Sequence, residues 1–312
     1  MANHRIIVNP ISGRGVGQQA LQEIRPMLRR YGLDCEISST ERPMHAVDLA
    51  RNAARDGCEV VVAVGGDGTA NEVLNGLMLA KDEGSGESTF GVISVGQGND
   101  FAFGVGVPPG LEAGCRVLAQ GHTRTIDIGR VTGGLYPDGR YFGNGVGIGF
   151  DAVVGFEALK LKRLHGFLAY LVAALKTIFL YYRAPLVEIE FDGQILTQPA
   201  LMVSIMNGRR MGGGFMMAPK ADTNDGLFDL CIARQVGRAR ILSLIPHFLK
   251  GTQASQDPIL TGQAHRLTVT ALEGVLPAHA DGETLCIDGV KLDLEILPSQ
   301  VKLISPSLEN RT

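Results

Sequence analysis

The chain has 312 residues, a formal net charge of −3 and a sequence pI near 6.2. This length suits two domains with a large buried core. The small net charge gives no electrostatic footprint for nucleic acid, so we expect no nucleic-acid partner. The chain contains 41 glycines, about twice the usual share of near 7%. We therefore expect many tight turns and close backbone approaches.

The cysteines and the apolar runs indicate a soluble, cytoplasmic protein. Five cysteines are dispersed without a CxxC spacing or a neighbouring histidine cluster, which is typical of reduced thiols. The N-terminal residues lead directly into a strand-like run and lack the shape of a signal peptide. The longest apolar run, Gly166 to Tyr182, is interrupted by Lys176 and is shorter than the roughly 20 residues of a membrane span.

The first part of the chain alternates between strand-like and helix-like segments. This alternation predicts a doubly wound parallel sheet with helices on both faces, and ligands at the carboxyl ends of its strands. The loops that leave these strands, at 9–13, 40, 65–69 and 96–100, should converge at one edge. We expect strands at 5–9, 33–39, 60–64 and 90–95, and helices at 16–31, at 43–56 and from Thr69 onward.

A glycine turn follows the apolar run Val60–Val64. Gly65, Gly66 and Gly68 allow the backbone to turn sharply, and Thr69 and Glu72 have the spacing of a capping box that would open a helix. A strand, a glycine turn and a helix N-terminus together favour an anion site. Asp67 would repel a bound phosphate unless a cation lies between them, which indicates nucleotide phosphate with Mg²⁺. The alternative interpretation is an ordinary strand-to-helix turn.

The pattern changes after Ile126–Ile128, where short strands become frequent. We divide the chain into an α/β domain at 1–128 and a β-rich, mostly antiparallel domain at 129–312, whose last residues could pack back on the first domain. Residues 140–147 look extended, and 150–182 look helical with a break near Gly166. Hairpin turns are predicted at Asp192-Gly193 and Asp288-Gly289. The remaining expected elements are strands at 187–191, 201–205, 228–233, 267–271, 285–287 and 292–296, and a helix at 238–250.

Two acidic turns in the second half have competing interpretations. Asp281 and Glu283 could supply catalytic carboxylates, but Asp-Gly-Glu is also an ordinary hairpin tip. The segment Asp222–Leu227 clusters oxygen ligands that could hold a hard cation, or it could form an Asx-type turn. His279 stands two residues before Asp281, where a lone histidine on a strand is more often structural.

A basic cluster precedes the apolar stretch Phe167–Tyr182. This arrangement could rest on an anionic membrane surface, or it could be the solvated start of a buried helix. The basic residues are Lys160, Lys162, Arg163 and His165.

Five motifs in order resemble the catalytic-domain family of diacylglycerol kinases, and more narrowly its soluble bacterial lipid kinases. The match runs over almost the whole chain. Its glycine turn alone is shared with NAD kinases and phosphofructokinases, so the combination carries the resemblance. The motifs are Asn9-Pro10-x-Ser12-Gly13, Gly65-Gly66-Asp67-Gly68-Thr69-x-Asn71-Glu72, Gly96-x-Gly98-Asn99-Asp100-Phe101-Ala102, Ala218-Pro219-x-Ala221-x-x-x-Asp225-Gly226 and Asp281-Gly282-Glu283.

The resemblance implies an active site in the cleft between the two domains. It implies that Asp281 is the general base with Glu283 close by, and that Mg²⁺ is held by the Asp225 carboxylate and main-chain oxygens of Asp222 and Leu227. The sequence departs from the family at Gln97, where a threonine is usual, so the side chain there lacks the hydroxyl that would contact ATP. The implied ATP-binding residues are Asn9, Pro10, Ile11, Ser12, Gly13, Thr40, Gly65, Gly66, Asp67, Gly68, Thr69, Ala70, Asn71 and Gln97.

Three functions are therefore weighed. The first is an ATP-dependent lipid kinase with diacylglycerol as the leading acceptor, acting on lipid at a membrane surface and peripheral to the inner leaflet. A groove for this lipid could be lined by Phe167–Tyr182 or by Ile241–Phe248. The second is an NAD kinase, and the third is a non-catalytic lipid- or nucleotide-binding regulator. The sequence leaves the acceptor lipid and the oligomeric state open, and a homodimer is compatible with it.

Overall fold

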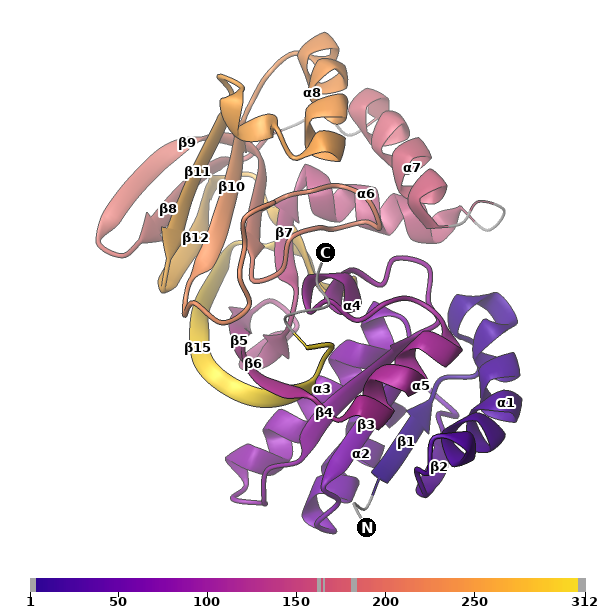
Figure 1. Ribbon diagram of the computed structural model, residues 1–312. Coiled ribbons are helices and arrows are strands. Elements are labelled where there is room, and N and C mark those ends of the chain that lie inside the picture. Colours follow the sequence, from indigo (N-terminus) through magenta and orange to yellow (C-terminus); the bar gives the residue numbers. More distant parts are fainter. Residues whose placement is uncertain (1–3, 162–163, 165, 181–183, 308–312) are drawn as a thin grey trace. The chain divides into compact units, whose positions relative to one another are not determined.

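The computed structural model describes residues 4–161, 164, 166–180 and 184–307 (Figure 1). The chain forms two compact units. Unit 1 comprises Met1–Ile126 and Ser299–Thr312, and unit 2 comprises Asp127–Pro298. Lys162, Arg163, His165 and Tyr182, which belong to the predicted basic cluster and apolar stretch, lie outside the described residues.

Unit 1 contains a parallel sheet, as the sequence predicts, and its strand order is β2-β1-β3-β4. The end of the last strand, β15 (Lys291–Ile304), adds to this sheet in parallel where Leu303 pairs with Phe90. The β3 run is fully buried, which suits a central strand with helices on both faces. The sheet strands are β1 (His4–Val8), β2 (Cys35–Ser39), β3 (Val60–Gly65) and β4 (Thr89–Ser94).

The helices of unit 1 pack in two groups (Figure 1). Ile24 and Leu28 of α1 and Leu118 of α5 share one apolar cluster with the sheet. Helices α2 and α3 pack so closely that a Cβ atom at Gly76 would lie 2.4 Å from the Val47 carbonyl oxygen. The helices are η1 (Ser12–Gly15), α1 (Val16–Arg30), α2 (His45–Arg55), α3 (Asp67–Asp82), α4 (Asp100–Gly104) and α5 (Leu111–Gln120).

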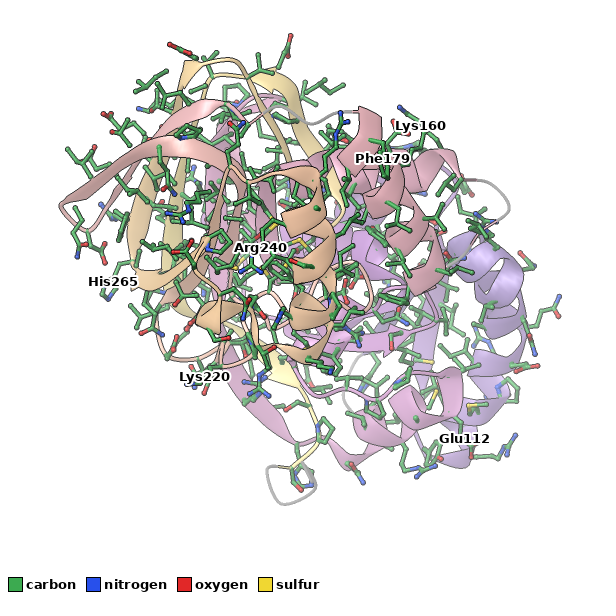
Figure 2. All side chains as sticks on the ribbon, turned by 90° about the horizontal axis from the view of Figure 1, so that it is seen from above. Glu112, Lys160, Phe179, Lys220, Arg240 and His265 are labelled. Carbon is green, nitrogen blue, oxygen red and sulfur yellow. The ribbon has the colours of Figure 1, made fainter. Side chains whose placement is uncertain are left out.

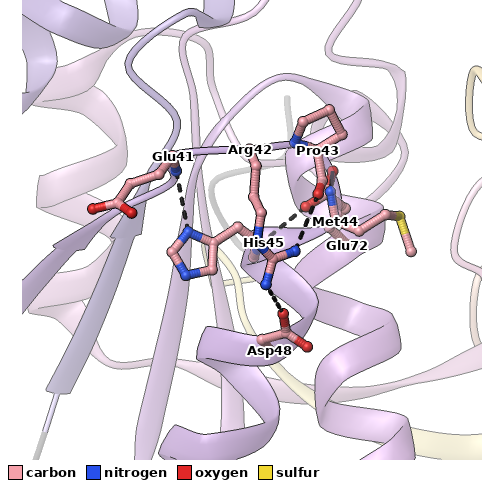
Figure 3. Close-up of polar contacts among 8 residues, drawn as sticks. Glu41, Arg42, Pro43, Met44, His45, Asp48 and Glu72 are labelled. Carbon is pink, nitrogen blue, oxygen red and sulfur yellow. Dashed lines mark hydrogen bonds and ion pairs between the residues drawn. The ribbon is translucent and has the colours of Figure 1, made fainter.

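The predicted capping box is wrong. Helix α3 begins at Asp67, two residues before the predicted start, and no side chain caps it at Gly66. Glu72 instead accepts hydrogen bonds from the N–H groups of Met44, at 3.1 Å, and Ala46, at 3.0 Å (Figure 3). The carboxylate therefore satisfies N–H donors at the N-terminus of α2, where negative charge is also favourable.

Unit 2 is mainly antiparallel, with the sheet path β14-β13-β7-β9-β8-β12-β15. The long strand β9 pairs with β8 through its first half and with β7 and β10 through its second half, so it joins the parts of the sheet. The strands are β5 (Thr123–Gly133), β6 (Tyr136–Phe142), β7 (Gly145–Gly149), β8 (Leu186–Phe191), β9 (Gln194–Met206), β10 (Phe228–Arg234), β11 (Ile259–Ala264), β12 (Arg266–Glu273), β13 (Leu276–Ala280) and β14 (Glu283–Gly289).

The helical part of unit 2 consists of α6 (Phe150–Lys160), α7 (Gly166–Leu180), α8 (Arg238–Lys250) and the short η2 (Gln253–Ser255). The predicted break near Gly166 and the predicted helix at 238–250 are both present. None of the described helices is long and apolar enough to span a membrane.

One predicted hairpin of unit 2 is confirmed and the other is wrong. Asp192-Gly193 connects β8 and β9, which pair with each other. Asp288-Gly289 ends β14, but β14 pairs with β13 and the following strand pairs with β12. The hairpin turn is Asp281-Gly282, between β13 and β14, where both residues have positive φ.

The five cysteines are free, as the sequence predicts, and Cys35 alone among them is not fully buried. Burial raises the pKa of the Cys115 and Cys231 thiols to about 12. A thiol with such a pKa stays protonated near neutral pH and is a poor nucleophile.

Candidate active site

The carboxyl ends of the central strands of unit 1 meet at the topological switch point of the sheet. Strand β1 leads outward to β2, whereas β3 leads in the other direction to β4. In doubly wound sheets, ligands bind at such a point. The predicted loops lie there together, because Asn9 donates to the Val64 carbonyl and both Val95 and Gly96 donate to the Gly65 carbonyl.

Glycine is required where two of these loops touch. A side chain at Gly96 would place its Cβ 2.3 Å from the Gly66 Cα, and one at Gly13 would lie 2.3 Å from the Val95 carbonyl oxygen. The Ser12 hydroxyl lies 3.6 Å from the Cβ position of Gly66. Gly13, Arg14 and Gly15 all have positive φ, a backbone shape of the kind that can present consecutive N–H groups to an anion.

Polar side chains tie the first loop to the glycine turn. Asn9 donates to the Thr69 hydroxyl at 3.0 Å and accepts from the Ile11 N–H at 3.2 Å. Thr69 and Asn71 are buried in the first turns of α3, and Asn75 donates to the Asn71 side chain. Thr40 lies at the same edge, since its N–H donates to the Val8 carbonyl.

Asp67 links the glycine turn to the loop after β4. One carboxylate oxygen accepts the Phe101 N–H at 3.0 Å, and the other lies 2.8 Å from the Cβ position of Gly98. Gly68 and Ala70 continue α3, and Pro10 follows Asn9 in the first loop. Gln97 is exposed in the loop after β4. The structure therefore gathers the predicted nucleotide-binding residues at one edge of unit 1.

Asp281 is held firmly within unit 2. Its carboxylate accepts hydrogen bonds from the N–H groups of Gly143 at 2.8 Å, Asn144 at 3.0 Å and Gly145 at 2.9 Å. The residue is 7% exposed and has a φ of 49°. This φ suits the first residue of an Asp-Gly hairpin turn, where aspartate and glycine are favoured. Glu283 begins the strand on the other side of this turn and is partly buried.

The predicted cation loop, also in unit 2, brings carboxylates together. Partial burial raises the pKa of the Asp225 carboxyl, and the Asp222 and Asp127 carboxylates raise it further. Burial, followed by the charge of Asp225, raises the pKa of Asp229 to about 6. Asp127, which sequence reasoning missed, is buried and accepts the Gly226 N–H at 2.7 Å.

The loop forms the Asx-type turn that is one of its two interpretations, since Asp225 Oδ1 accepts the Leu227 N–H at 3.0 Å. Its oxygen atoms also suit a hard cation. A bound divalent ion would neutralise the crowding of negative charge, and carboxylate and carbonyl oxygens are suitable ligands. No group of three His, Cys, Asp or Glu side chains that could hold a metal occurs among the described residues. The predicted set needs no such group, because it uses one carboxylate with the main-chain oxygens of Asp222 and Leu227.

A narrow apolar cavity lies in unit 2 between helices α6, α7 and α8 and strands β9 and β10. Asp151 is the charged residue of its wall. Both segments that the sequence suggests for a lipid groove contribute to it. Its lining comprises Phe150, Asp151, Val154, Ala174, Leu201, Met202, Phe215, Met217, Ala233, Ile241, Leu244, Ile245 and Phe248. Flexible methionine side chains allow such a cavity to adapt to a ligand.

Sequence reasoning missed Asp151 and treated His279 as structural. Both are largely buried, and His279 Nε2 lies 3.9 Å from Asp151 Oδ1. No motif marks the pair, since the two residues stand more than a hundred positions apart and meet only through strand pairing.

Comparison with known proteins defines the class. A family model described as the diacylglycerol kinase catalytic domain matches residues 3–131. A second, described as the YegS C-terminal NAD kinase beta sandwich-like domain, matches residues 144–305.

Whole-chain comparisons agree with the family models. A diacylglycerol kinase of Bacillus subtilis is 32% identical over 91% of this chain and 90% of its own length. A diacylglycerol kinase of Mycobacterium tuberculosis is 27% identical over 96% of this chain and 94% of its own length. A putative diacylglycerol kinase structure from Bacillus anthracis superposes with a TM-score of 0.78 at 24% identity, covering 98% and 97% of the two chains. The structure of an NAD kinase of Archaeoglobus fulgidus in complex with ATP superposes with a TM-score of 0.51 at 13% identity, covering 97% of this chain and 93% of its own.

These similarities identify the chain as a member of the diacylglycerol kinase family. It is a lipid kinase that transfers phosphate to an alcohol acceptor. The two low-identity structural likenesses show the fold alone.

Proposed function

We propose that the protein transfers the γ-phosphoryl group of ATP to a lipid hydroxyl, with diacylglycerol as the first candidate acceptor. The observation that carries the lipid part is the apolar cavity of unit 2, whose wall is built almost entirely from aliphatic and aromatic side chains. Such a wall suits an acyl chain and is unsuited to a dinucleotide such as NAD. Kinship to proteins named diacylglycerol kinase supports this choice of acceptor.

Unit 1 would bind the phosphoryl donor. Phosphoryl transfer depends mainly on positioning and on neutralising charge. The loops at 9–13, 65–71 and 96–100 offer backbone N–H groups and the N-terminus of α3, which suit the phosphates of ATP. The hydrogen bond from Asn9 to Thr69 holds the first two loops together.

Unit 2 would bind the lipid acceptor. Asp281 would accept the proton of the attacking lipid hydroxyl as general base, with Glu283 close by. The three N–H groups of Gly143, Asn144 and Gly145 fix the carboxylate in place. A fixed base loses little entropy when the substrate arrives.

Mg²⁺ would be held at the loop of Asp225, with main-chain oxygens of Asp222 and Leu227. When bound, the ion would supply positive charge that stabilises the loop preceding β10. The mutual repulsion of the Asp225, Asp222 and Asp127 carboxylates supports this assignment.

We also propose peripheral contact with an anionic membrane through helix α7 and its neighbours. Leu168, Leu175 and Phe179 are exposed, and their spacing places them on one face of the helix. Lys160 and Phe179 both project from the surface (Figure 2). Co-sedimentation with phosphatidylglycerol vesicles should fall with rising salt and in Phe179→Ala, and unchanged binding in both conditions would contradict the contact.

A lipid-panel assay tests the function directly. Purified protein, ATP and Mg²⁺ are mixed with vesicles that contain diacylglycerol, monoacylglycerol, phosphatidylglycerol or sphingosine, and mass spectrometry identifies the product. Soluble NAD is included as a competing acceptor. Phosphatidic acid is the expected main product, and the absence of any phosphorylated lipid would refute the proposal.

A further inference from the structure

Three residues stand in a row across neighbouring strands of unit 2. His279 of β13 pairs with Gly147 of β7, and Gly147 pairs on its other side with Ser204 of β9. Because the central residue is glycine, the row has a notch between its two polar ends. A Cβ at Gly147 would lie 2.3 Å from Asp151 Oδ2 and 2.7 Å from His279 Nε2.

The carboxylate of Asp151 occupies this notch. Its Oδ2 accepts the Ser204 hydroxyl at 3.3 Å, and its Oδ1 lies 3.9 Å from His279 Nε2. The Asp151 side chain is 12% exposed and forms part of the wall of the apolar cavity, whereas His279 does not line that cavity. His279 therefore lies behind Asp151, outside the cavity lining.

Packing alone does not account for a histidine at this position. His279 is 7% exposed, and its Nδ1 is buried without a hydrogen-bond partner among the described residues. Its neighbours Ala278 and Ala280 are fully buried and apolar. A buried polar atom without a partner is costly, so its presence requires an explanation.

His279 also lies next to the proposed base. It precedes Asp281 by two residues at the end of β13, and the Asp281 N–H donates to the Gly145 carbonyl of the same central strand β7. The segment from His279 to Asp281 thus contains both the residue beside the Asp151 carboxylate and the proposed base.

We propose that His279 is a positioning residue for the acceptor lipid. Together with Ser204 it holds the Asp151 carboxylate in the cavity wall, and it stands two residues before Asp281 in the chain. This inference rests on the proposed lipid kinase function and names a residue of the acceptor site outside the predicted set.

The test compares three variants with the wild type. His279→Leu removes the polar support, and His279→Gln keeps a hydrogen-bonding group. Leu276→Val disturbs the same buried strand three residues away, at its other end. Each is assayed for the KM of diacylglycerol and of ATP, for kcat and for thermal stability. Binding of a fluorescent diacylglycerol is measured without ATP.

Removing the imidazole, whose Nε2 lies 3.9 Å from Asp151 Oδ1, takes a polar neighbour from a largely buried carboxylate. This should lower kcat/KM for the lipid, and affinity for the fluorescent lipid, about tenfold in His279→Leu. The KM for ATP should stay unchanged, and His279→Gln should recover most of the loss. Leu276→Val should lower stability without changing lipid affinity.

The other outcomes overturn the inference in different ways. Unchanged lipid affinity in His279→Leu, or an equal loss in Leu276→Val, would show that the residue is merely structural. If the wild type binds the fluorescent lipid but phosphorylates none, the proposed function fails while the binding comparison still decides the role of His279. If the wild type binds no lipid, both proposals fall.

Discussion

At the scale of single residues, Asp281 has a structural role in its turn and a proposed role as general base, and the two roles can be tested separately. Its carboxylate holds three N–H groups, so it stabilises the turn before β7 whatever chemistry it performs. The same anchoring leaves it in a left-handed conformation at a hairpin tip. A purely structural carboxylate and a catalytic base therefore make different predictions for the same substitution.

Asp281→Asn should lower kcat for lipid phosphorylation by about 100-fold or more, because the amide cannot accept the hydroxyl proton. The melting temperature should also fall, since the amide NH₂ faces an N–H donor. Asp288→Asn is the matched control, an exposed aspartate before a glycine at the end of the next strand. Wild-type turnover in Asp281→Asn, at a temperature where it is folded, would leave Asp281 a structural role only.

Asp225→Asn tests the cation loop by a measurement other than activity. Mg²⁺ should raise the melting temperature of the wild type, because an ion that binds only the folded state stabilises it. The variant should lose this response, while without Mg²⁺ it should be at least as stable as the wild type, because repulsion with Asp222 and Asp127 is relieved. An equal Mg²⁺ response in both proteins would remove Asp225 from the site.

At the scale of elements, Glu157 of α6 links this helix to α7 by an ion pair. It is 2% exposed, accepts from Lys160 at 2.6 Å and also pairs with Lys176 of α7. Hydrogen bonds from Lys160 and then Lys176 lower the pKa of Glu157 from 4.5 to about 2. This contact supports the helices that line the apolar cavity.

Glu157→Gln should lower the free energy of unfolding by about 1–2 kcal/mol at pH 7, because hydrogen bonds to a charged group are lost. A lowered pKa in the folded state stabilises the protein above the unfolded value of 4.5, and this contribution disappears as the pH falls toward about 2. Urea unfolding at pH 7 and pH 3 should therefore show a smaller difference between variant and wild type at the lower pH. A constant difference would contradict the pKa assignment.

Elements with strong local signals could be predicted, and those defined by tertiary pairing could not. The helix at 238–250 and the break before Gly166 follow from apolar periodicity and glycine. Strand β7 is missed as a separate strand because three of its five residues are glycine and carry no side-chain pattern. Glu72 looks like a capping residue of its own helix, yet it caps α2 because that helix packs alongside.

The candidate site shows the same division. The nucleotide loops could be located because parallel strands bring their carboxyl ends to one edge. Asp151 and His279 could not, because their proximity depends on the register of β7 with β13 and on the short α6 that follows β7. Local sequence does not encode such a register.

At the scale of the whole molecule, the last strand belongs to both units. Residues 291–295 of β15 pair with β12 in unit 2, whereas Leu303 pairs with Phe90 at the edge of the unit 1 sheet. Gln300 also accepts a hydrogen bond from Lys81 Nζ at 2.9 Å, and Leu303 and Ile304 are buried. Unit 1 therefore depends on residues supplied from the far end of the chain.

A chain truncated after Pro298 should lose this edge strand and the burial of Val301, Leu303 and Ile304. Removing the end of β15 leaves β4 paired only with β3. The exposed edge and the open apolar surface should make unit 1 melt earlier than unit 2. Scanning calorimetry, with ATP added to mark the transition of unit 1, measures the effect. A chain ending at Ser307 keeps every described contact of β15 and is the matched control. If both truncated chains melt like the full-length protein, β15 does not hold unit 1 together. If only the shorter chain loses the ATP-dependent shift, the edge strand is a structural requirement for nucleotide binding.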